Sequence, residues 1–365
     1  MKNILCVIES LNSGGGQKQL VELSKSLKEK GHNVSFLIFH PKYFFLEELN
    51  KVDIPVKIIQ NKNFFYRFIN ARRFIRSGNF DAIISFLVIS NLICEFASLP
   101  SKKWKLIVGE RSADPKIGTS LKLRLFRFFH FLSDYIVANS QANIDLIKNI
   151  NPLIKRNKFQ VIYNTLDIDH WKPKTETSKK SKSYFTIVVA ARHQYLKNFD
   201  GLIEAVNRLT EQDKTKLKIK WFGNYNTNPN DGSYEAGIQK IKKYQLEKNF
   251  ELCPPSKNIK SEMEEADAVG LFSFYEGFPN AICEAMALGK PVIASNVSDL
   301  PFFLKNEPNL IVNPGNIEDL NKGLEYLIHL SSEDKVKIGQ ANRTMAAEKF
   351  NKEKIVGEYL NLLKG

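Results

Sequence analysis

The sequence predicts an α/β protein of two doubly wound units that face each other across a cleft. Two observations predict this fold class. Short β-rich runs alternate with helical patterns through most of the 365 residues, and one lysine-rich segment interrupts the alternation near the middle of the chain. Such alternation is typical of a parallel sheet that helices cover on both faces. Because ligands bind beyond the carboxyl ends of such strands, we expect the functional site in the cleft.

The first half contains the elements of one such unit. Helical patterns fill most of the gaps between its strands; after the first strand, for example, Leu20, Leu23 and Leu27 recur at helical spacing. The strand candidates are Ile4–Ile8, Val34–Phe39, Val56–Ile59, Ala82–Phe86, Leu106–Val108, Tyr135–Val137 and Gln160–Tyr163.

A polar segment, Lys172–Lys182 (KPKTETSKKSK), then has the composition of a solvated linker or loop. The alternation resumes after it, and helical patterns extend to Leu363. We therefore predict an N-terminal domain over residues 1–168, a C-terminal domain over 183–348, and a helix over 349–365 that packs back toward the N-terminal domain. The strand candidates of the second half are Phe185–Val189, Leu217–Phe222, Phe250–Leu252, Ala268–Phe272, Val292–Ala294 and Leu310–Val312.

The composition is that of a soluble protein with an anionic partner. The four cysteines are scattered without metal-ligand spacing, as is typical of reduced thiols in a cytosolic protein. Met1–Ile8 is too short an apolar run for a signal peptide, and Ala82–Phe96 is shorter than the ~20 residues of a spanning helix, so we expect a strand that continues into a helix there. The net charge of +14 suggests nucleic acid, an anionic membrane surface or phosphorylated substrates as partners.

Three consecutive glycines, Gly14–Gly16, lie between the first strand and the first helix. A strand-to-helix turn can bring backbone N–H groups and the positive end of the helix close to an anion. The glycines match neither the spaced dinucleotide fingerprint nor a P-loop. From these residues alone, a phosphate site and a plain tight turn are both open.

The second half has the most specific pattern, FSFYEGFPNAICEAMALGKPVIAS over Phe272–Ser295. A strand leads into a loop with Glu276, and the following helix carries Glu284 before a Gly-Lys-Pro sequence ends it. Carboxylates so placed can accept hydrogen bonds from vicinal sugar hydroxyls. The alternative is an acid near a helix N-terminus, favoured by the helix dipole, together with an exposed glutamate.

Arg192 and Lys197 flank a short loop at the end of an earlier strand of the same half. Two cations at the carboxyl end of a strand suit a diphosphate. The alternative is that they only solvate the loop.

Together these segments resemble glycosyltransferase family 4, whose members are retaining enzymes of the GT-B fold that use nucleotide-sugar donors. The resemblance covers nearly the whole chain, and Glu276–Val292 is its most specific part. Trp221-Phe222-Gly223 falls where the family has a glycine-containing strand end, and Asn164–Asp167 falls at its interdomain segment.

The resemblance implies a role for each site residue. Arg192, Lys197 and Glu276 are the implied catalytic residues: the two cations neutralise the diphosphate as the glycosidic bond breaks, and Glu276 holds hydroxyls of the donor sugar. Glu284 accepts the ribose hydroxyls of the nucleotide. The remaining residues of the implied nucleotide-sugar site are Gly15, Gly16, Gly277, Phe278, Pro279, Asn280 and Ala281, with backbone N–H groups of the Gly277–Ala281 segment helping Glu276.

Two departures from the family pattern are visible. Many relatives have a histidine after the fifth strand of the first domain, where this chain has Glu110 or Arg111. These two residues contact the acceptor or the donor sugar, or they form an ion pair at the strand end. Ser295–Phe303 (SNVSDLPFF) lacks the Gly-Gly and Glu that commonly follow the Lys-Pro-Val strand, which leaves part of the donor-side rim undefined.

We expect no metal and no cofactor. Asp167-Ile168-Asp169 looks like the DxD motif of metal-dependent glycosyltransferases, but it lies in the interdomain connection, and the GT-B enzymes that this chain resembles need no metal. The six histidines show no metal-ligand spacing either.

Two stretches of the first half mix cations with apolar side chains. Lys62–Arg76 has five cations among aromatic residues, and Ser120–Leu132 (SLKLRLFRFFHFL) has Lys122, Arg124 and Arg127. Such stretches suit docking on an anionic membrane face without crossing it. A core helix with outward-pointing cations is the alternative, and no recognisable motif accompanies the charge to indicate nucleic acid.

The sequence therefore predicts a metal-independent, retaining hexosyltransferase on the cytoplasmic face of the membrane. It would move a hexose or N-acetylhexosamine from a nucleotide diphosphate, UDP in our prediction, to a lipid-linked glycan in bacterial surface-polysaccharide assembly. Two alternatives remain open: a nucleotide-sugar 2-epimerase of the same architecture, and a non-catalytic protein that binds nucleotide or nucleic acid.

Overall fold

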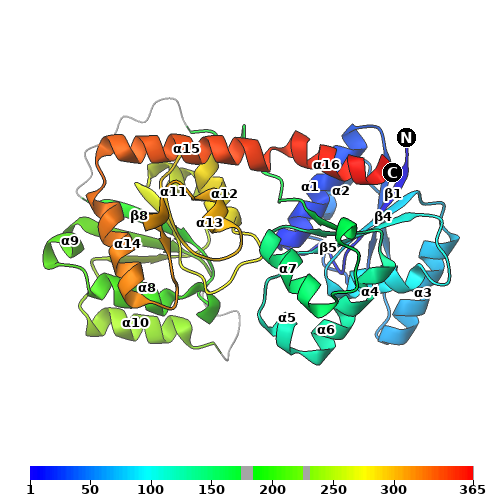
Figure 1. The fold of residues 1–365 in the computed structure, drawn as a ribbon, viewed down its shortest axis with the longest axis horizontal. Coiled ribbons are helices and arrows are strands. Elements are labelled where there is room, and N and C mark those ends of the chain that lie inside the picture. The colour runs from blue at the N-terminus through cyan, green and yellow to red at the C-terminus, as the bar shows by residue number, and fades with distance from the viewer. Residues whose placement is uncertain (174–183, 225–230, 365) are drawn as a thin grey trace. The chain divides into compact units, whose positions relative to one another are not determined.

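A computed structural model describes residues 1–173, 184–224 and 231–364, and it divides the chain into two compact units (Figure 1). One unit consists of Met1–Thr165 with Lys352–Gly365, and the other is Leu166–Asn351. Most of the predicted linker, residues 174–182, lies outside the described residues, as does residue 183.

The first unit has a seven-stranded sheet in the order β3-β2-β1-β4-β5-β6-β7, and every neighbouring pair is parallel. All seven strand candidates are present, with ends that differ by at most two residues from the predicted ones. The order reverses between β1 and β4, which makes their carboxyl ends the topological switch point of this sheet. The strands are β1 Asn3–Val7, β2 Asn33–Ile38, β3 Val56–Ile58, β4 Ala82–Phe86, β5 Lys105–Glu110, β6 Tyr135–Ala138 and β7 Phe159–Val161.

Helices cover both faces of this sheet. Ile4 and Cys6 of β1 belong to a buried cluster with residues of α1 and of the C-terminal helix α16, whereas Leu5 and Val7 point into a second cluster with residues of α3 and α4. The helices are α1 Gly15–Glu29, α2 Leu46–Asn50, α3 Phe64–Ser77, α4 Val88–Ala97, α5 Lys116–Thr119, α6 Leu121–Phe128, α7 Gln141–Ile150 and α16 Lys352–Lys364, with 3-10 turns η1 Phe129–Leu132 and η2 Arg156–Lys158.

The second unit repeats this architecture with six strands in the order β10-β9-β8-β11-β12-β13, again all parallel. Its order reverses between β8 and β11. The predicted strands of this half are all present: β8 Phe185–Ala190, β9 Leu217–Phe222, β10 Phe250–Cys253, β11 Ala268–Leu271, β12 Val292–Ser295 and β13 Ile311–Val312.

The helices of the second unit also cover a sheet with a fully buried core. Ile187 and Val189 of β8 pack with residues of α8, α10 and α14. None of the helices within the described ranges has both the length and the apolar character that crossing a membrane requires. The helical elements are η3 Tyr195–Lys197, α8 Phe199–Asn207, α9 Glu211–Lys216, α10 Ser233–Lys243, α11 Ile259–Glu265, α12 Asn280–Ala287, α13 Leu300–Phe303, η4 Pro308–Leu310, α14 Ile317–His329 and α15 Ser332–Phe350.

Candidate functional site

The switch point of the second sheet brings together two of the predicted site loops. β8 and β11 are adjacent parallel strands, so the loops after them leave the sheet at the same edge. Lys197 lies in the first loop and Glu276 in the second. Lys197 Nζ is 2.6 Å from Glu276 Oε1, and the two side chains are 18% and 12% exposed. The fold therefore joins residues 79 positions apart into one half-buried ion pair.

The two loops are tied together by their backbones and side chains. Phe274 N donates to the Leu196 carbonyl oxygen at 2.8 Å, and the rings of Phe274 and Tyr195 stack with centroids 5.2 Å apart. Asn198 then adopts a left-handed conformation, φ 56°, and its side chain caps α8. These contacts hold Lys197 and Glu276 in place without any contribution from a ligand.

Glu276 has one engaged and one available carboxylate oxygen. Lys197 Nζ and the hydroxyl of Ser273 both donate to Oε1, each at 2.6 Å. Within the part of the chain that the structure describes, Oε2 has no hydrogen-bond partner. A carboxylate held in this way can accept a hydrogen bond from a sugar hydroxyl, and Ser273 is a supporting residue that the sequence interpretation missed.

The rest of the predicted donor segment forms the entry to α12. Gly277 and Ala281 lie at the loop and the first helical turn, where backbone N–H groups are not engaged in the helix ladder. Pro279 has no N–H and cannot donate, in contrast to the expectation that the whole segment would supply N–H groups. Phe278 is buried against Phe350, with ring centroids 5.5 Å apart. Asn280 begins the helix, and Glu284 lies half-buried one turn later on it.

The segment that departs from the family pattern supports this loop directly. Ser298 has φ 54°, a left-handed conformation that favours glycine, at the place where the resemblance led us to expect Gly-Gly. Its hydroxyl donates to the Gly277 carbonyl oxygen at 3.1 Å. Ser298 therefore keeps the backbone conformation that glycine would allow and adds a tether for the loop after Glu276.

Arg192 lies at the same sheet edge but is exposed. It follows β8, and no described residue forms an ion pair or hydrogen bond with its guanidinium. The preceding residue, Ala191, approaches Gly223 so closely that a Cβ atom at residue 223 would lie only 1.9 Å from the Ala191 carbonyl oxygen. Trp221 Nε1 donates to that same oxygen at 2.7 Å. The structure thus presents an unengaged cation on a rigid strand end.

His193 is adjacent to Arg192 and belongs to the core of the second unit. Its ring stacks on Trp221, with centroids 5.3 Å apart, and meets Phe199 edge-on. Burial lowers the pKa of His193 to about 4, so the imidazole is neutral near pH 7. It contributes aromatic packing beneath the loop that carries Arg192.

The glycines of the first unit lie at its own switch point. Gly14 caps α1 in an extended conformation, φ −156°, and Gly15 begins the helix. A Cβ atom on Gly16 would be 3.5 Å from Leu87 Cδ2, an ordinary contact, so the fold does not require a glycine there. Leu87, between β4 and α4, has φ 74° and ψ 151°, a conformation that residues with side chains rarely adopt.

Glu110 ends β5 inside a buried chain of four charged side chains. Arg127 Nη2 and Nε donate to Glu110 Oε2 at 3.0 and 3.2 Å, and His130 Nε2 is 2.9 Å from Glu110 Oε1. His130 Nδ1 is 2.5 Å from Glu95 Oε1. All four residues are buried. Of the two roles that the sequence left open for Glu110, the structure shows the strand-end ion pair.

The charge state of this buried cluster follows from its contacts. Burial opposes the charged imidazole of His130, but the carboxylates of Glu95 and Glu110 outweigh burial and raise the pKa of His130 to about 9. Burial also opposes ionisation of Glu110, and Arg127 together with His130 still lowers its pKa below the ordinary value. Burial raises the pKa of Glu95, whose Oε2 has no hydrogen-bond partner among residues 1–173, 184–224 and 231–364.

Arg111 follows Glu110 and points elsewhere. Its guanidinium carbon lies 3.9 Å from the centroid of the Phe86 ring, and Nη2 donates to the Tyr359 hydroxyl of α16 at 2.5 Å. Nη1 donates to Asn164 Oδ1 at 3.4 Å. The half-buried guanidinium is therefore held against Phe86, the last residue of β4.

The aspartates of the DxD-like sequence have a local role. Asp167 Oδ1 accepts a hydrogen bond from His170 N at 2.8 Å, which closes a turn. Among the described residues, no group of three His, Cys, Asp or Glu side chains is arranged to hold a metal ion.

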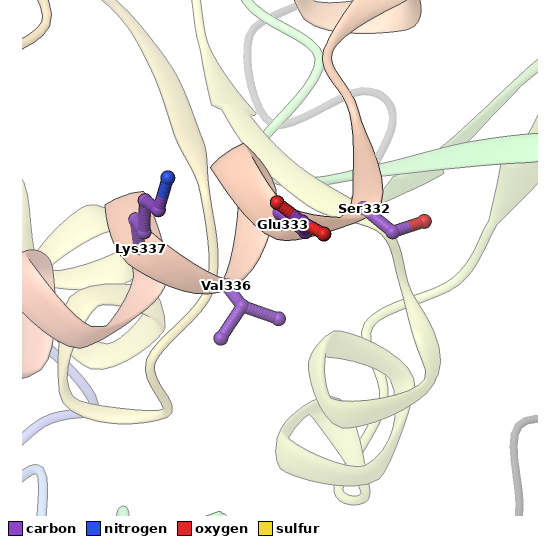
Figure 2. A pocket seen from close by; sticks show the side chains of 4 residues that line it. All are labelled: Ser332, Glu333, Val336 and Lys337. Atoms are coloured by element: carbon purple, nitrogen blue, oxygen red, sulfur yellow. The ribbon is translucent and has the colours of Figure 1, made fainter.

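A shallow hollow on the first turns of α15 lies apart from these residues. Figure 2 shows the side chains that line it, Ser332, Glu333, Val336 and Lys337. Lys335 Nζ of the same turns lies 4.5 Å from the ring of Phe185, the first residue of β8. Lys197 lies in the loop after the last residue of β8, Ala190. The hollow is near the first residue of that strand, and it is therefore at the opposite edge of the sheet from the Lys197–Glu276 pair.

Comparison with known proteins gives consistent matches along almost the entire chain. A family model described as Glycosyltransferase Family 4 matches residues 13–170, and one described as Glycosyl transferases group 1 matches residues 171–345.

Two relatives come from Campylobacter jejuni. One is the N-acetylgalactosamine-N,N'-diacetylbacillosaminyl-diphospho-undecaprenol 4-alpha-N-acetylgalactosaminyltransferase, 24% identical over 384 residues, with 100% of both chains covered. The other, a GalNAc-alpha-(1->4)-GalNAc-alpha-(1->3)-diNAcBac-PP-undecaprenol alpha-1,4-N-acetyl-D-galactosaminyltransferase, is 24% identical over 301 residues, covering 78% of this chain and 77% of the relative.

Among solved structures, HepE of Anabaena in complex with UDP and glucose superimposes with a TM-score of 0.84. The sequences are 20% identical, and the match covers 100% of this chain and 99% of HepE. At this identity the likeness describes the fold, two parallel Rossmann-like sheets.

Proposed function

We propose that this chain, which belongs to glycosyltransferase family 4 and has the GT-B fold of nucleotide-sugar glycosyltransferases, is a retaining enzyme of surface-polysaccharide assembly. It moves a hexose or N-acetylhexosamine from a UDP-sugar to a glycan carried on a lipid diphosphate. The names of the Campylobacter relatives support the acceptor class, and the UDP in the HepE complex supports the nucleotide.

The observation that carries the proposal is the Lys197–Glu276 pair. Its cation and its available carboxylate oxygen lie at one sheet edge, beside the first turn of α12. We assign the diphosphate to Lys197 and Arg192, a hydroxyl of the donor sugar to Glu276 Oε2, and the ribose hydroxyls to Glu284. A diphosphate, a sugar and a ribose are the parts of a nucleotide-sugar donor.

The reaction that follows needs no protein nucleophile. The bond between the sugar C1 and the diphosphate oxygen breaks while the acceptor hydroxyl attacks C1 from the same face. The acceptor proton passes to the leaving phosphate oxygen, and UDP is the second product. Lys197 and Arg192 stabilise the charge that grows on the diphosphate, in place of a metal ion, and removal of one such group lowers the rate by about 10²–10³-fold.

The first unit supplies the acceptor side in this proposal. Gly15 and Gly16 leave the start of α1 without side chains, and Arg111 presents a fixed cation near the end of β4. Because the acceptor is attached to a lipid, the enzyme works as a peripheral protein on the cytoplasmic face of the membrane.

The test of the donor site is calorimetric titration of UDP and GDP into wild-type, Lys197→Ala and Glu284→Ala proteins. We expect UDP to bind, and each variant to bind it roughly 10- to 100-fold more weakly, as expected for the loss of a charge-assisted hydrogen bond. The matched control is Lys240→Ala, which removes a lysine 2.7 Å from Glu204 elsewhere in the same unit. Equal UDP affinity of wild-type and Lys197→Ala proteins would refute the assigned site.

A second variant separates the two halves of the pair. Glu276→Gln removes the carboxylate charge and leaves Lys197 free for phosphate, so UDP should bind at least as tightly as to wild type. Transfer from the intact UDP-sugar should fall by about 100-fold, since the sugar hydroxyl exchanges a charged carboxylate acceptor for a neutral amide oxygen. Weaker UDP binding by Glu276→Gln would show that Glu276 does not face the sugar.

Product analysis tests the reaction class. With a UDP-sugar and a lipid-diphosphate glycan, release of UDP should depend on the acceptor. Interconversion of nucleotide sugars without an acceptor would indicate the epimerase alternative, and ligand binding with no UDP release would indicate a binding protein.

A further inference from the structure

The helix α6 and the following turn η1 have inverted amphipathicity. Leu121 and Leu125 are 82% and 55% exposed, and Phe128 and Phe131 are each 44% exposed. On the inner side of the same segment, Arg127 and His130 are buried. Most surface helices place apolar residues inward and charged residues outward. In this segment, by contrast, four large apolar side chains point outward and two charged or polar side chains point inward.

The buried charge cluster explains how this reversal is stabilised. Arg127 reaches inward to Glu110 of β5, and His130 bridges Glu110 and Glu95 of α4. These contacts fix which face of α6 points inward. The prediction that Arg127 belongs to a basic outer surface is therefore wrong, because its side chain is 2% exposed. The leucines and phenylalanines are left on the outside by the same geometry.

The apolar surface continues beyond α6. Asn151 Nδ2 donates to the Phe128 carbonyl oxygen at 3.0 Å, which holds the loop after α7 against the end of α6. In this loop Leu153 is 87% exposed. Phe131 and Leu153 line one small hollow together with Ile154, Lys155 and Lys158. We call the set Leu121, Leu125, Phe128, Phe131 and Leu153 the α6 surface.

The two segments that carry the α6 surface contain only positive charges. Neither Ser120–Leu132 nor Asn151–Phe159 contains an aspartate or glutamate. Lys122, Arg124 and Lys155 are exposed there. A group of large exposed apolar side chains that alternates with exposed cations along the same segments suits the boundary between anionic headgroups and acyl chains.

The other basic and aromatic stretch, on α3, has largely internal functions. Arg72 Nη2 donates to the Leu99 carbonyl oxygen at 2.7 Å, and Arg76 Nη1 donates to the carbonyl oxygens of Ala97 and Leu99 at 2.9 and 2.8 Å. These arginines cap the C-terminal end of α4. The exposed aromatic residues Phe65 and Tyr66 of α3 therefore serve as a comparison for α6.

We propose that the α6 surface is the membrane-docking surface of the protein and that its partner is an anionic phospholipid bilayer. This inference rests on the proposed function, which places the acceptor in a membrane, and names the residues that bring the enzyme there. Leu121, Leu125, Phe128, Phe131 and Leu153 insert among the acyl chains, and Lys122, Arg124 and Lys155 contact headgroup phosphates.

The test is flotation of the full chain with vesicles of phosphatidylglycerol mixed with phosphatidylcholine, compared with vesicles of phosphatidylcholine alone. Wild-type protein should bind the anionic vesicles more tightly, and added salt should weaken binding. Leu125→Ser/Phe128→Ser should lower the affinity by about 100-fold, at roughly tenfold for each large apolar side chain that no longer inserts. Lys122→Gln/Arg124→Gln should lower it by roughly 20- to 30-fold, at about 1 kcal/mol for each cation near the headgroups.

Two controls accompany these variants. Phe65→Ser/Tyr66→Ser removes two aromatic residues of α3 that are more exposed, at 65% and 58%, than Leu125 and Phe128. It should leave vesicle binding within about twofold of wild type, since the proposal places α6 and not α3 among the acyl chains. UDP titration reports on the other unit: every variant should bind UDP as wild type does, so failure of the donor site and failure of docking are seen separately.

Three outcomes would overturn the proposal: equal binding to neutral and anionic vesicles, wild-type vesicle affinity for Leu125→Ser/Phe128→Ser, or an equal loss for the α3 variant. Ultracentrifugation tests the alternative that a second copy of the chain covers the surface. That alternative would be supported if wild-type protein forms dimers and Leu125→Ser/Phe128→Ser forms monomers with unchanged vesicle binding.

Discussion

Two ion pairs of this chain each join a glutamate near the carboxyl edge of a sheet to a cation, and they differ in what they leave open. In the second unit, Lys197 and Glu276 are 18% and 12% exposed, and the described residues engage only Oε1 of Glu276. In the first unit, Arg127 and Glu110 are 2% and 3% exposed, and both oxygens of Glu110 are engaged. The open pair can exchange a protein contact for a ligand contact, whereas the closed pair can only hold elements together.

The comparison shows that strand-end position alone does not distinguish a binding residue from a structural one. Glu110 and Glu276 both occupy places where α/β proteins bind ligands. What separates them is whether a second and a third charged side chain close over the carboxylate. For Glu110, α6 and η1 supply Arg127 and His130, whereas in the described part of the chain only Lys197 and Ser273 donate to Glu276.

The largest expected difference between the pairs is in stability. Arg127→Ala leaves Glu110 charged and buried beside a single remaining partner, which should lower the free energy of unfolding by about 3–5 kcal/mol. Lys197→Ala removes a partner from a carboxylate that is 12% exposed and keeps its hydrogen bond from Ser273, and it should lower the free energy of unfolding by no more than about 1 kcal/mol. Urea unfolding of both variants, followed by circular dichroism, measures the difference. Equal stability of the two variants would mean that the closed pair is no more structural than the open one.

The sequence predicted the strands of this fold better than it predicted the contacts of the site. Apolar, β-branched runs such as Leu217–Phe222 mark buried parallel strands, and the parallel topology then brings the loops after β8 and β11 together. Lys197 and Glu276 could thus be expected at one sheet edge from the order of elements alone.

The partners of Glu110 could not be expected in the same way. Arg127 lies 17 residues from Glu110 in an apolar stretch that suggested an outward basic face, and only the rotation of α6 decides which side of the helix is buried. Ser298 was missed for a related reason. Its left-handed conformation at a position expected for glycine is a property of the backbone, which the residue type conceals.

A pH titration sharpens the comparison, since only the closed cluster contains a histidine. The pKa of His130 is raised from its ordinary value of 6.5 to about 9, so its stabilising contribution is complete below pH 6.5 and is lost as the pH rises through 9. Between these values the free energy of unfolding should fall by no more than about 3.4 kcal/mol, at most about 1.4 kcal/mol per pH unit. Urea unfolding at several pH values measures this slope.

His130→Gln is the control for that titration. Glutamine cannot carry the proton between Glu95 and Glu110, so the variant should be less stable at pH 6.5 and should lose most of the slope. A variant that keeps the full slope would place the titrating group elsewhere.

The smallest expected effect on stability comes from a glycine at the switch point of the first sheet. Its substitution distinguishes a role in folding from a role in substrate binding. Gly16 lies in the first turn of α1, and a Cβ atom there would make only an ordinary 3.5 Å contact with Leu87. Gly16→Ala should therefore raise the free energy of unfolding by about 0.5–1 kcal/mol, because alanine restricts the unfolded chain and favours the helix. Gly118→Ala in α5, where the nearest atom would be 3.7 Å away, is the matched control with the same expected gain.

If the bare start of α1 admits substrate, Gly16→Ala lowers the transfer rate despite its greater stability, and Gly118→Ala does not. Full transfer activity in Gly16→Ala would mean that the glycine run only forms the turn into α1.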